Sequence, residues 1–276
     1  MPTFKVVLAY DGTAFVGWQR QANGTSIQGL LEHALRELDQ RDVAVAGAGR
    51  TDAGVHALGQ VAAFSLARAL PATAVVRALN ARLPGTIRVL SAEEVASGFH
   101  PRFGARTKTY RYRVWNGDVI SPFERRYAWH VPGTLDVEAM SAAATRLVGA
   151  HDFAAFQASG ASTRTTERLI GSSLVFRHRL DRRIPVFVEG RCADPWAADP
   201  HGARQADAEP LVLYEATGSG FLRHMVRIIV GTLVEIGRGR RPVAWMGDVL
   251  ASRDRALAGP TAPPDGLFLV GVAYQT

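Results

Sequence analysis

The chain has 276 residues, of which 47% are hydrophobic and 21% are charged. This balance is typical of soluble globular proteins and excludes a wholly disordered or fibrous chain, while the length suggests about two domains. The single cysteine, Cys192, excludes an intramolecular disulfide framework and a zinc site built from several cysteines. No apolar run reaches the roughly 18 residues of a membrane span, and residues 1–8 do not resemble a secretory signal. We therefore expect a cytoplasmic protein.

Basic residues outnumber acidic residues by 32 to 25, which gives a net charge of +7. The 32 basic residues are 30 arginines and two lysines, Lys5 and Lys108. Guanidinium groups bind phosphates in a bidentate geometry, so the excess is compatible with a nucleic-acid partner. A compositional bias is the simpler explanation of the ratio itself, and the positions of the arginines must decide between the two.

The first hundred residues alternate between predicted strands and helices. Apolar residues recur at helical spacing from Ser26 to Leu38, which predicts an amphipathic helix with Ser26 as its N-cap. A second helix is predicted over Ala72–Leu83. Short apolar runs bounded by turn residues predict strands at Phe4–Ala9, Val43–Ala46, Gln60–Leu66 and Ile87–Leu90.

The rest of the chain continues this mixture. Strands are predicted at Tyr110–Trp115, Leu169–Arg177, Leu211–Thr217 and Leu267–Tyr274, and helices at Val137–Val148, Phe221–Ile236 and Pro242–Ala251. The stretch 178–210 lacks a sustained period and predicts a surface excursion. We expect an α+β fold of two α/β halves with mainly antiparallel sheets, the first at 1–105 and the second at 106–276.

The most informative stretch is the glycine-rich loop from Gly47 to Gly54. Its flanking glycines permit a sharp turn and a close approach of a ligand, and they display Asp52 two residues after Arg50. A carboxylate in that place can act as a nucleophile, a general base or a metal ligand. An ordinary Asx turn also fits the local pattern.

A second feature is a run of basic and aromatic residues. Its members are Arg102, Phe103, Arg106, Lys108, Tyr110, Arg111, Tyr112 and Arg113. Alternation along a strand places Tyr110 and Tyr112 on one face and Arg111 and Arg113 on the other. Such a surface suits looped RNA, in which splayed bases stack on rings and phosphates meet arginine. A sheet with packed tyrosines and solvated arginines fits equally well.

The predicted helix Phe221–Ile236 is apolar on several sides and carries Arg227 in its middle. A buried guanidinium requires an acidic partner, and Asp52 is a candidate for it. Arg223, one turn earlier in the helix, competes for that role. Alternatively, Arg227 is half-exposed and reaches water or Glu235.

Several motifs of other enzyme classes are missing from the sequence. It contains no P-loop, no dinucleotide fingerprint after the first strand, and no nucleophile elbow. Its eight histidines are not spaced as metal ligands. A reaction without metal or cofactor is therefore favoured.

The chain closely resembles the TruA family of tRNA pseudouridine synthases. The decisive stretch is the loop from Gly49 to Ala57, which reads Gly-Arg-Thr-Asp-Ala-Gly-Val-His-Ala. Further shared motifs are Ala9–Thr13, Gly17–Gln19, Ser26–Gly29, Phe99–His100 with Arg102, Lys108–Tyr112, His151–Phe153, Phe221–Leu222, Met225–Arg227 and Pro260–Pro263. The resemblance covers all of the chain except about 178–210.

The resemblance implies a pseudouridine synthase fold of two pseudo-symmetric halves flanking a basic cleft, working as a homodimer without a cofactor. It implies conversion of uridine to pseudouridine at positions 38, 39 and 40 in the anticodon stem-loop of tRNA. Asp52 is then the catalytic carboxylate, Tyr110 packs against the uracil and Arg227 pairs with Asp52. Residues expected to contact the RNA are Arg50, which helps to extrude the base, and Arg102, Lys108, Tyr110, Leu222 and Arg223.

Two other functions use some of the same residues. One is a non-catalytic RNA-binding or chaperone protein, which requires no carboxylate in the glycine-rich loop. The other is a metal-dependent phosphoesterase that uses Asp52, Asp11 and His56. The sequence does not choose among attack of the carboxylate at the ribose C1′, attack at the uracil C6, and deprotonation of the sugar to a glycal.

Overall fold

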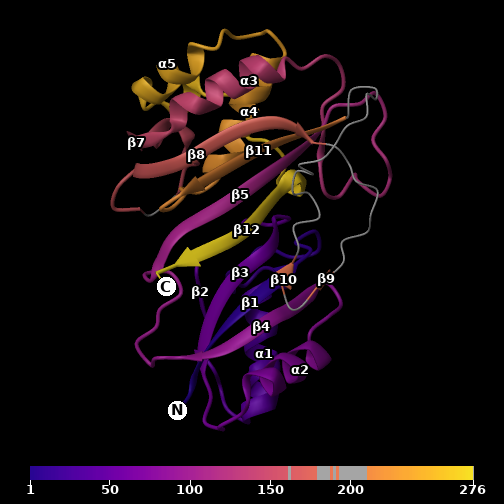
Figure 1. The fold of residues 1–276 in the computed structure, drawn as a ribbon, viewed down its shortest axis with the longest axis vertical. Helices are drawn as coiled ribbons and strands as arrows, with labels where there is room; N and C mark the ends of the chain where they lie inside the picture. Colours follow the sequence, from indigo (N-terminus) through magenta and orange to yellow (C-terminus); the bar gives the residue numbers. More distant parts are fainter. Residues whose placement is uncertain (161–162, 179–186, 189–190, 193–209, 276) are drawn as a thin grey trace. The chain divides into compact units, whose positions relative to one another are not determined.

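The computed structural model describes residues 1–160, 163–178, 187–188, 191–192 and 210–275 (Figure 1). The chain divides into two compact units. The first unit comprises Met1–Arg106, Pro185–Ala193 and Phe268–Thr276, and the second comprises Thr107–Ile184 and Asp194–Leu267. The last strand therefore belongs to the first unit, although the residues of the second unit precede it in the sequence.

The first unit is built on a sheet in which β1 lies between β3 and β4. Its strands are β1 (Thr3–Tyr10), β2 (Ala46–Gly47), β3 (His56–Ser65), β4 (Ile87–Val95) and β12 (Leu267–Tyr274). Strand β1 runs antiparallel to both of its neighbours, whereas β12 pairs in parallel with the start of β3 through Phe268 and Leu269. The order of strands and helices over the first hundred residues is the predicted one, with β3 and β4 longer than expected.

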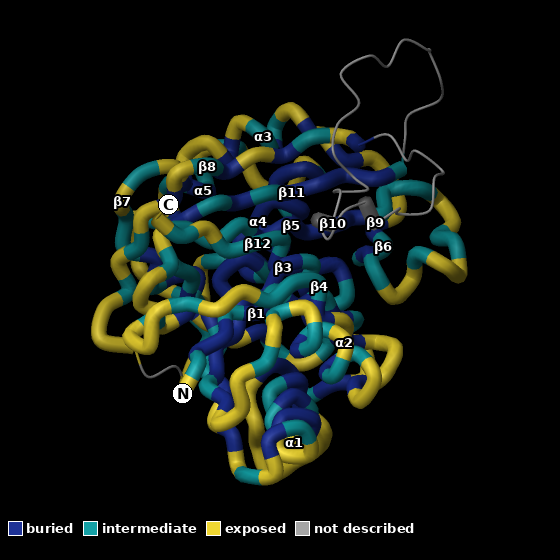
Figure 2. The backbone as a smooth tube through the Cα atoms, turned by 60° about the horizontal axis from the view of Figure 1, so that its bottom comes forward, coloured by how far each residue is buried: buried dark blue, intermediate teal, exposed yellow. Residues whose placement is uncertain are grey.

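Helix α1 (Ile27–Asp39) forms where the spacing of apolar residues predicts it, and it packs against α2 (Ala72–Arg82). The Ser26 hydroxyl accepts a hydrogen bond from the Gly29 amide at 3.2 Å, which confirms the predicted N-cap. Ile27, Leu31 and Leu35 form the buried stripe of the helix, whose other side is exposed (Figure 2).

The strand predicted over Val43–Ala46 is wrong for most of its length, because β2 comprises only Ala46 and Gly47. The side chains of Val43 and Val45 are buried as expected for an apolar run. The backbone of Val45, however, bonds to side chains of α1 and not to a strand. Its carbonyl accepts from the Gln28 amide at 3.0 Å, and its N–H donates to Glu32 at 3.4 Å.

The second unit contains an antiparallel sheet in the order β5, β11, β8 and β7. The strands are β5 (Ala105–Trp115), β7 (Gly149–Asp152), β8 (Glu167–His178) and β11 (Leu211–Gly218), and the short β6 (Trp129–His130) pairs in parallel with β5. Helices α3 (Val137–Ala144), α4 (Met225–Gly237) and α5 (Trp245–Ser252) lie on one side of this sheet (Figure 1). Helix α4 is buried on nearly all sides, as predicted, with Arg227 and Glu235 as the exceptions.

Three helix boundaries in this unit differ from the predictions by three or four residues, and one of them is the start of α5 at Trp245 instead of Pro242. Helix α3 ends at Ala144 and continues as a 3-10 turn over Thr145–Leu147. Helix α4 begins at Met225 instead of Phe221, because His224 adopts a left-handed backbone with φ +59°. An apolar pattern does not reveal such a break, since Phe221 and Leu222 before it are also apolar.

The excursion predicted at 178–210 falls almost entirely outside the described residues. Only the short paired strands β9 (Phe187–Val188) and β10 (Arg191–Cys192) are described within it, by their backbone. Arg179, Arg182 and Arg183 lie outside the described residues. Arg177, just before the excursion, donates hydrogen bonds to Asn116 and to the Leu135 carbonyl within the second unit.

The described part of the chain is an α+β structure with mostly antiparallel sheets and five α-helices, and it confirms the predicted α+β class. None of its helices combines the length and the hydropathy required to span a membrane.

Candidate active site

Asp52 lies in the loop that connects β2 to β3 in the first unit. The exposure of the side chains alternates along this loop. Arg50 is exposed, Thr51 is buried at 6% exposure, and Asp52 is half-buried. The carboxylate is therefore held partly in the protein while the arginine two residues earlier points into solvent.

The residue beside Asp52 is fixed through both its side chain and its backbone. The hydroxyl groups of Thr51 and Tyr10 are hydrogen-bonded at 2.8 Å, and the Trp18 amide donates to the Thr51 carbonyl at 3.1 Å. The Gln60 side chain donates to the Gly49 carbonyl at 3.0 Å. Burial raises the pKa of Tyr10 to about 12, against the opposing hydrogen bonds, so this phenol stays neutral at physiological pH.

The loop after β1 packs against the Asp52 loop so closely that it requires glycine at two positions. Gly17 has a φ of +107°, and a Cβ atom there would lie 2.5 Å from the Thr51 carbonyl oxygen. A Cβ atom on Gly12 would lie 2.0 Å from the Val55 carbonyl oxygen. Real Cβ atoms do not approach this closely, so only glycine lets the loop after β1 support the Asp52 loop. The motifs around Asp11 and Trp18 thus support the Asp52 loop.

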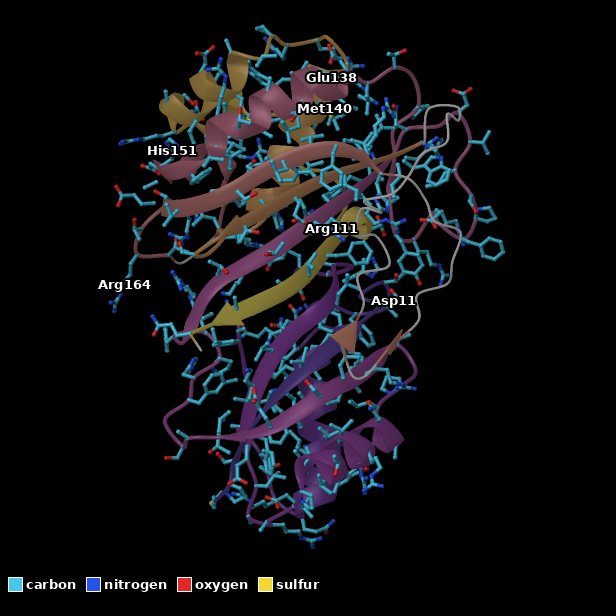
Figure 3. The ribbon with its side chains drawn as sticks, viewed as in Figure 1. Asp11, Arg111, Glu138, Met140, His151 and Arg164 are labelled. Carbon is cyan, nitrogen blue, oxygen red and sulfur yellow. The ribbon has the colours of Figure 1, made fainter. Side chains whose placement is uncertain are left out.

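His56 is a packed core residue at the end of the same loop. Its side chain is 1% exposed, and its ring stacks on Phe268 with centroids 4.6 Å apart. Its Nδ1 atom accepts the Gly12 amide at 3.0 Å and lies 3.2 Å from a carboxylate oxygen of Asp11, which Figure 3 labels. Among the residues that the structure describes, no three histidine, cysteine or carboxylate side chains gather as metal ligands. The phosphoesterase built on Asp52, Asp11 and His56 therefore gains no support.

Tyr110 belongs to β5 in the second unit, and Lys108 precedes it on the same strand. The Tyr110 side chain is 8% exposed and meets the ring of Phe221 edge-on, with centroids 4.9 Å apart. Leu222, which follows Phe221 in the sequence, is buried, and Lys108 is half-buried. The predicted RNA-contacting residues of this unit therefore include two, Tyr110 and Leu222, whose side chains are largely covered by protein.

Arg227 is half-buried in α4, so the premise of a fully buried guanidinium is wrong. Its Nε atom donates to the Ala262 carbonyl at 2.7 Å, and the Ala262 amide donates back to the Arg227 carbonyl at 3.1 Å. Gly231 admits this segment against the helix, since a Cβ atom there would lie 1.7 Å from the Pro260 carbonyl oxygen. The Pro260–Pro263 motif thus fixes the orientation of Arg227.

Arg223 does not lie on the helix, which corrects the expectation that it shares a helical face with Arg227. The left-handed residue His224 separates Arg223 from α4. The exposed Arg223 side chain donates instead to the Ser159 carbonyl at 3.2 Å, and its own carbonyl accepts the Ala158 amide at 3.1 Å. This leaves Arg227 as the arginine of α4 that the sequence singled out.

Arg111 and Arg113 are neither solvated nor available to phosphates, which corrects both interpretations of these two arginines. The tyrosines of the same strand, Tyr110 and Tyr112, are packed as the alternative interpretation predicts. Arg111, labelled in Figure 3, is 6% exposed and forms an ion pair with Glu215 at 2.6 Å. Arg113 is 2% exposed and forms an ion pair with Glu124, also at 2.6 Å. Burial lowers the pKa of Arg113, and the Glu124 carboxylate opposes that shift.

The sequence motifs missed one supporting residue, Gln60. It is the one polar residue of the Ala57–Phe64 stretch of β3, and its buried amide reaches Gly49 in the loop. A single polar side chain in such a run is the signal that could have found it, since buried amides require partners. Asp52, Arg50 and Arg102 belong to the first unit, and Tyr110, Arg223 and Arg227 belong to the second.

Comparison with known proteins decides the family. The family model described as tRNA pseudouridine synthase matches residues 6–104 and 143–275. The chain belongs to the tRNA pseudouridine synthase family. The matched stretches of this synthase family include Asp52 and Arg227, whereas Lys108 and Tyr110 lie between them.

Full-length relatives in the synthase family agree. The tRNA pseudouridine synthase A of Myxococcus xanthus is 46% identical over 275 residues, which covers 100% of this chain and 93% of the relative. That of Syntrophotalea carbinolica is 43% identical over 99% of this chain and 97% of the relative. That of Geotalea uraniireducens is 42% identical over 99% and 100%, respectively.

Proposed function

We propose that this protein is an isomerase that converts uridine to pseudouridine at positions 38, 39 and 40 of the tRNA anticodon stem-loop, with Asp52 as its catalytic carboxylate. The observation that carries the proposal is the Asp52 loop itself. Thr51 is pinned to Tyr10 and Trp18, and Gly12 and Gly17 leave no room for other side chains. A loop backbone held by so many fixed neighbours positions the side chain that it carries in advance for reaction.

The reaction needs what this loop offers. The bond between the ribose C1′ and the uracil N1 breaks, the uracil turns, and C1′ bonds to C5. The proton on C5 is lost and N1 is protonated, so substrate and product are isomers and no redox partner or leaving fragment is involved. A carboxylate attacking C1′ or C6, or abstracting a sugar proton, must be ionised, and we propose that Arg227 pairs with Asp52 to favour that form.

The remaining roles follow from exposure and chemistry. Arg50 is exposed and lies two residues before Asp52. We propose that its side chain fills the space that the target base vacates when it leaves the stack, a step that costs a few kcal/mol. Tyr110 packs against the uracil. Arg102, Lys108, Leu222 and Arg223 contact the RNA, with Arg102 and Arg223 exposed to do so.

The test is replacement of Asp52 by asparagine, which keeps the shape and removes the charge. With tRNA tritiated at uracil C5, we expect the rate of tritium release to fall by roughly 10⁴-fold or more, as for other catalytic nucleophiles. Asp136→Asn is the matched control, because Asp136 is a helix N-cap that asparagine also serves. Undiminished release by the Asp52→Asn protein would refute the role of Asp52, whereas absence of release by the wild-type protein would favour a non-catalytic RNA-binding protein.

Arg227→Ala tests the proposed partner of Asp52. We expect turnover to be lost while tRNA binding is largely kept, because the guanidinium acts on the carboxylate and not on the RNA backbone. A collapse of binding with normal turnover of bound tRNA would contradict the pairing. Activity in excess EDTA is expected, since the proposed reaction uses no metal or other cofactor.

The finer architecture belongs to the same proposal. We assign the protein two pseudo-symmetric halves, with the catalytic Asp loop in the first, that flank a basic cleft, and we expect a cytoplasmic homodimer. Light scattering after gel filtration measures the oligomeric state directly. Pseudouridine mapping in tRNA from cells with and without the protein checks the positions modified, and the absence of a difference at 38, 39 and 40 would contradict them.

A further inference from the structure

Phe103 is exposed in a way that the other rings of the basic and aromatic segment are not. Tyr110 and Tyr112 are 8% and 0% exposed, so neither offers a free aromatic face on the surface. The Phe103 side chain is 78% exposed. Of the three rings between Arg102 and Arg113, Phe103 is therefore the one that an incoming molecule can cover.

The turn that carries Phe103 is held rigid by its own hydrogen bonds. The Nδ1 atom of His100 accepts the backbone amides of Arg102 and Phe103 at 3.2 and 3.4 Å, and the Gly104 amide donates to the His100 carbonyl at 2.9 Å. The Tyr274 hydroxyl donates to the Pro101 carbonyl at 2.7 Å. The ring thus stands outward on a fixed base, which reduces the entropy lost when a ligand covers it.

One side of the Phe103 ring is already supported. The His100 ring lies beside it with centroids 4.3 Å apart and an interplanar angle of 36°. The Arg102 guanidinium carbon lies 5.9 Å from the ring centroid. Because His100 occupies one side, the exposed area lies mainly on the other side and at the ring edge. A flat apolar surface with a cation at its rim is the result.

The charge around the turn selects the kind of ligand. Residues 96–108 include three cations, Arg102, Arg106 and Lys108, and no aspartate or glutamate. Arg102 and Arg106 are exposed. Single-stranded RNA matches this combination, because its bases stack on aromatic rings and its phosphates bind arginine. An apolar protein surface would use the ring but would offer no phosphate to Arg102 and Arg106.

We propose that Phe103 stacks on an unpaired nucleobase of the tRNA substrate, other than the target uridine, while Arg102 binds an adjoining phosphate. This inference rests on the proposed function, since it assumes an RNA substrate. It adds a binding subsite formed by His100, Arg102 and Phe103, and it gives Phe103 a role in affinity and not in the chemical step.

The experiment measures the Kd of an unmodified tRNA transcript in the Asp52→Asn protein, so that the RNA stays unconverted. Phe103→Ala is expected to weaken binding by about 5- to 100-fold, the range for loss of one base–aromatic stack. Phe103→Leu keeps an apolar side chain but no flat face and should weaken binding similarly. Phe103→Trp should bind within about twofold of the parent and show tryptophan quenching on addition of transcript, beyond that of the five native tryptophans.

Phe123→Ala is the matched control, because Phe123 is 84% exposed and is followed by the exposed Arg125 and Arg126 but is not part of the turn. Its binding should equal that of the parent. Unchanged affinity of Phe103→Leu, or an equal loss in Phe123→Ala, overturns the proposal. A change in oligomeric state on substituting Phe103 also overturns it, and assigns the ring to contact with a second copy of the chain. If the wild-type protein itself releases no tritium, the proposed function fails, whatever Phe103 does.

Discussion

Replacing Tyr10 by phenylalanine tests the support of the Asp52 loop separately from the proposed chemistry of Asp52. The substitution removes one oxygen atom and leaves the ring in place. Thr51, 6% exposed and adjacent to Asp52, then loses the partner that its hydroxyl meets at 2.8 Å. Gln60 also contacts the Tyr10 hydroxyl, but this contact is long, at 3.5 Å, and weak. The stronger hydrogen bond from Gln60 to the Gly49 carbonyl, at 3.0 Å, is kept. The perturbation is thus confined to one buried hydroxyl pair.

The size of the effect follows from that pair. A buried hydrogen bond contributes about 0.5–1.5 kcal/mol, and a hydroxyl left unsatisfied costs about 1–3 kcal/mol. We expect the free energy of unfolding to fall by about 1–2 kcal/mol, which lowers the Tm of a chain of this length by about 2–4 °C. Since Thr51 precedes Asp52 directly, we expect kcat for tritium release to fall by about 3- to 10-fold with KM unchanged.

Tyr214→Phe is the matched control for this experiment. Tyr214 is a buried tyrosine of the second unit, and its hydroxyl is hydrogen-bonded to Ser173 at 3.1 Å. Its loss should lower the Tm by a similar amount without changing kcat. Equal losses of activity in Tyr10→Phe and Tyr214→Phe would show that stability alone explains them. An unchanged kcat in Tyr10→Phe, with the Tm lowered, would refute the idea that the hydroxyl pair positions the carboxylate.

Three further outcomes are expected. Gly231→Ala should lower kcat more than tRNA affinity. The added Cβ atom would lie 1.7 Å from the Pro260 carbonyl oxygen and displace the segment that orients Arg227. Normal turnover would contradict this. Glu124→Ala should lower the free energy of unfolding in urea by about 2–4 kcal/mol, because it leaves the buried Arg113 without its carboxylate; a loss below about 0.5 kcal/mol would refute that reading. The free energy of unfolding of the wild-type protein should fall between about pH 10 and pH 12. Tyrosine in the unfolded chain ionises near pH 10.0, whereas burial holds the pKa of Tyr10 in the folded protein at about 12. The Tyr10→Phe protein should lose less stability over that pH range.

The local elements of the fold were predictable because their signals are local. The apolar spacing and the Ser26 cap of α1 lie within one stretch of sequence, and both are confirmed. Strand β12 was also predicted at its full length. The errors arise where a distant or special contact intervenes. Side chains of α1 satisfy the backbone of Val45, and the left-handed His224 shortens α4.

The candidate site divides in the same way. The glycine-rich loop indicated Asp52 because sharp turns and close approaches require glycine. The structure shows a positive φ of +79° at Gly54 in that loop, and close approaches to it at Gly12 and Gly17 of the loop after β1. What no local pattern could give is which backbone group those glycines face. The Thr51 carbonyl lies against Gly17 although 34 positions separate them in the sequence. The roles of Asp52 and Arg227 remain predictions until the variants are assayed.

The arginines show why net charge is a poor measure of an RNA surface. Arg111 finds its carboxylate 104 positions away, on a neighbouring strand, so nothing near it in the sequence distinguishes it from an arginine that faces RNA. Once Arg111 and Arg113 are paired inside the protein, each cation is cancelled by its own glutamate. The salt dependence of tRNA binding counts only phosphate contacts. It should therefore respond to substitution of the exposed Arg50 or Arg102, whereas the paired arginines affect binding only through the stability of the fold.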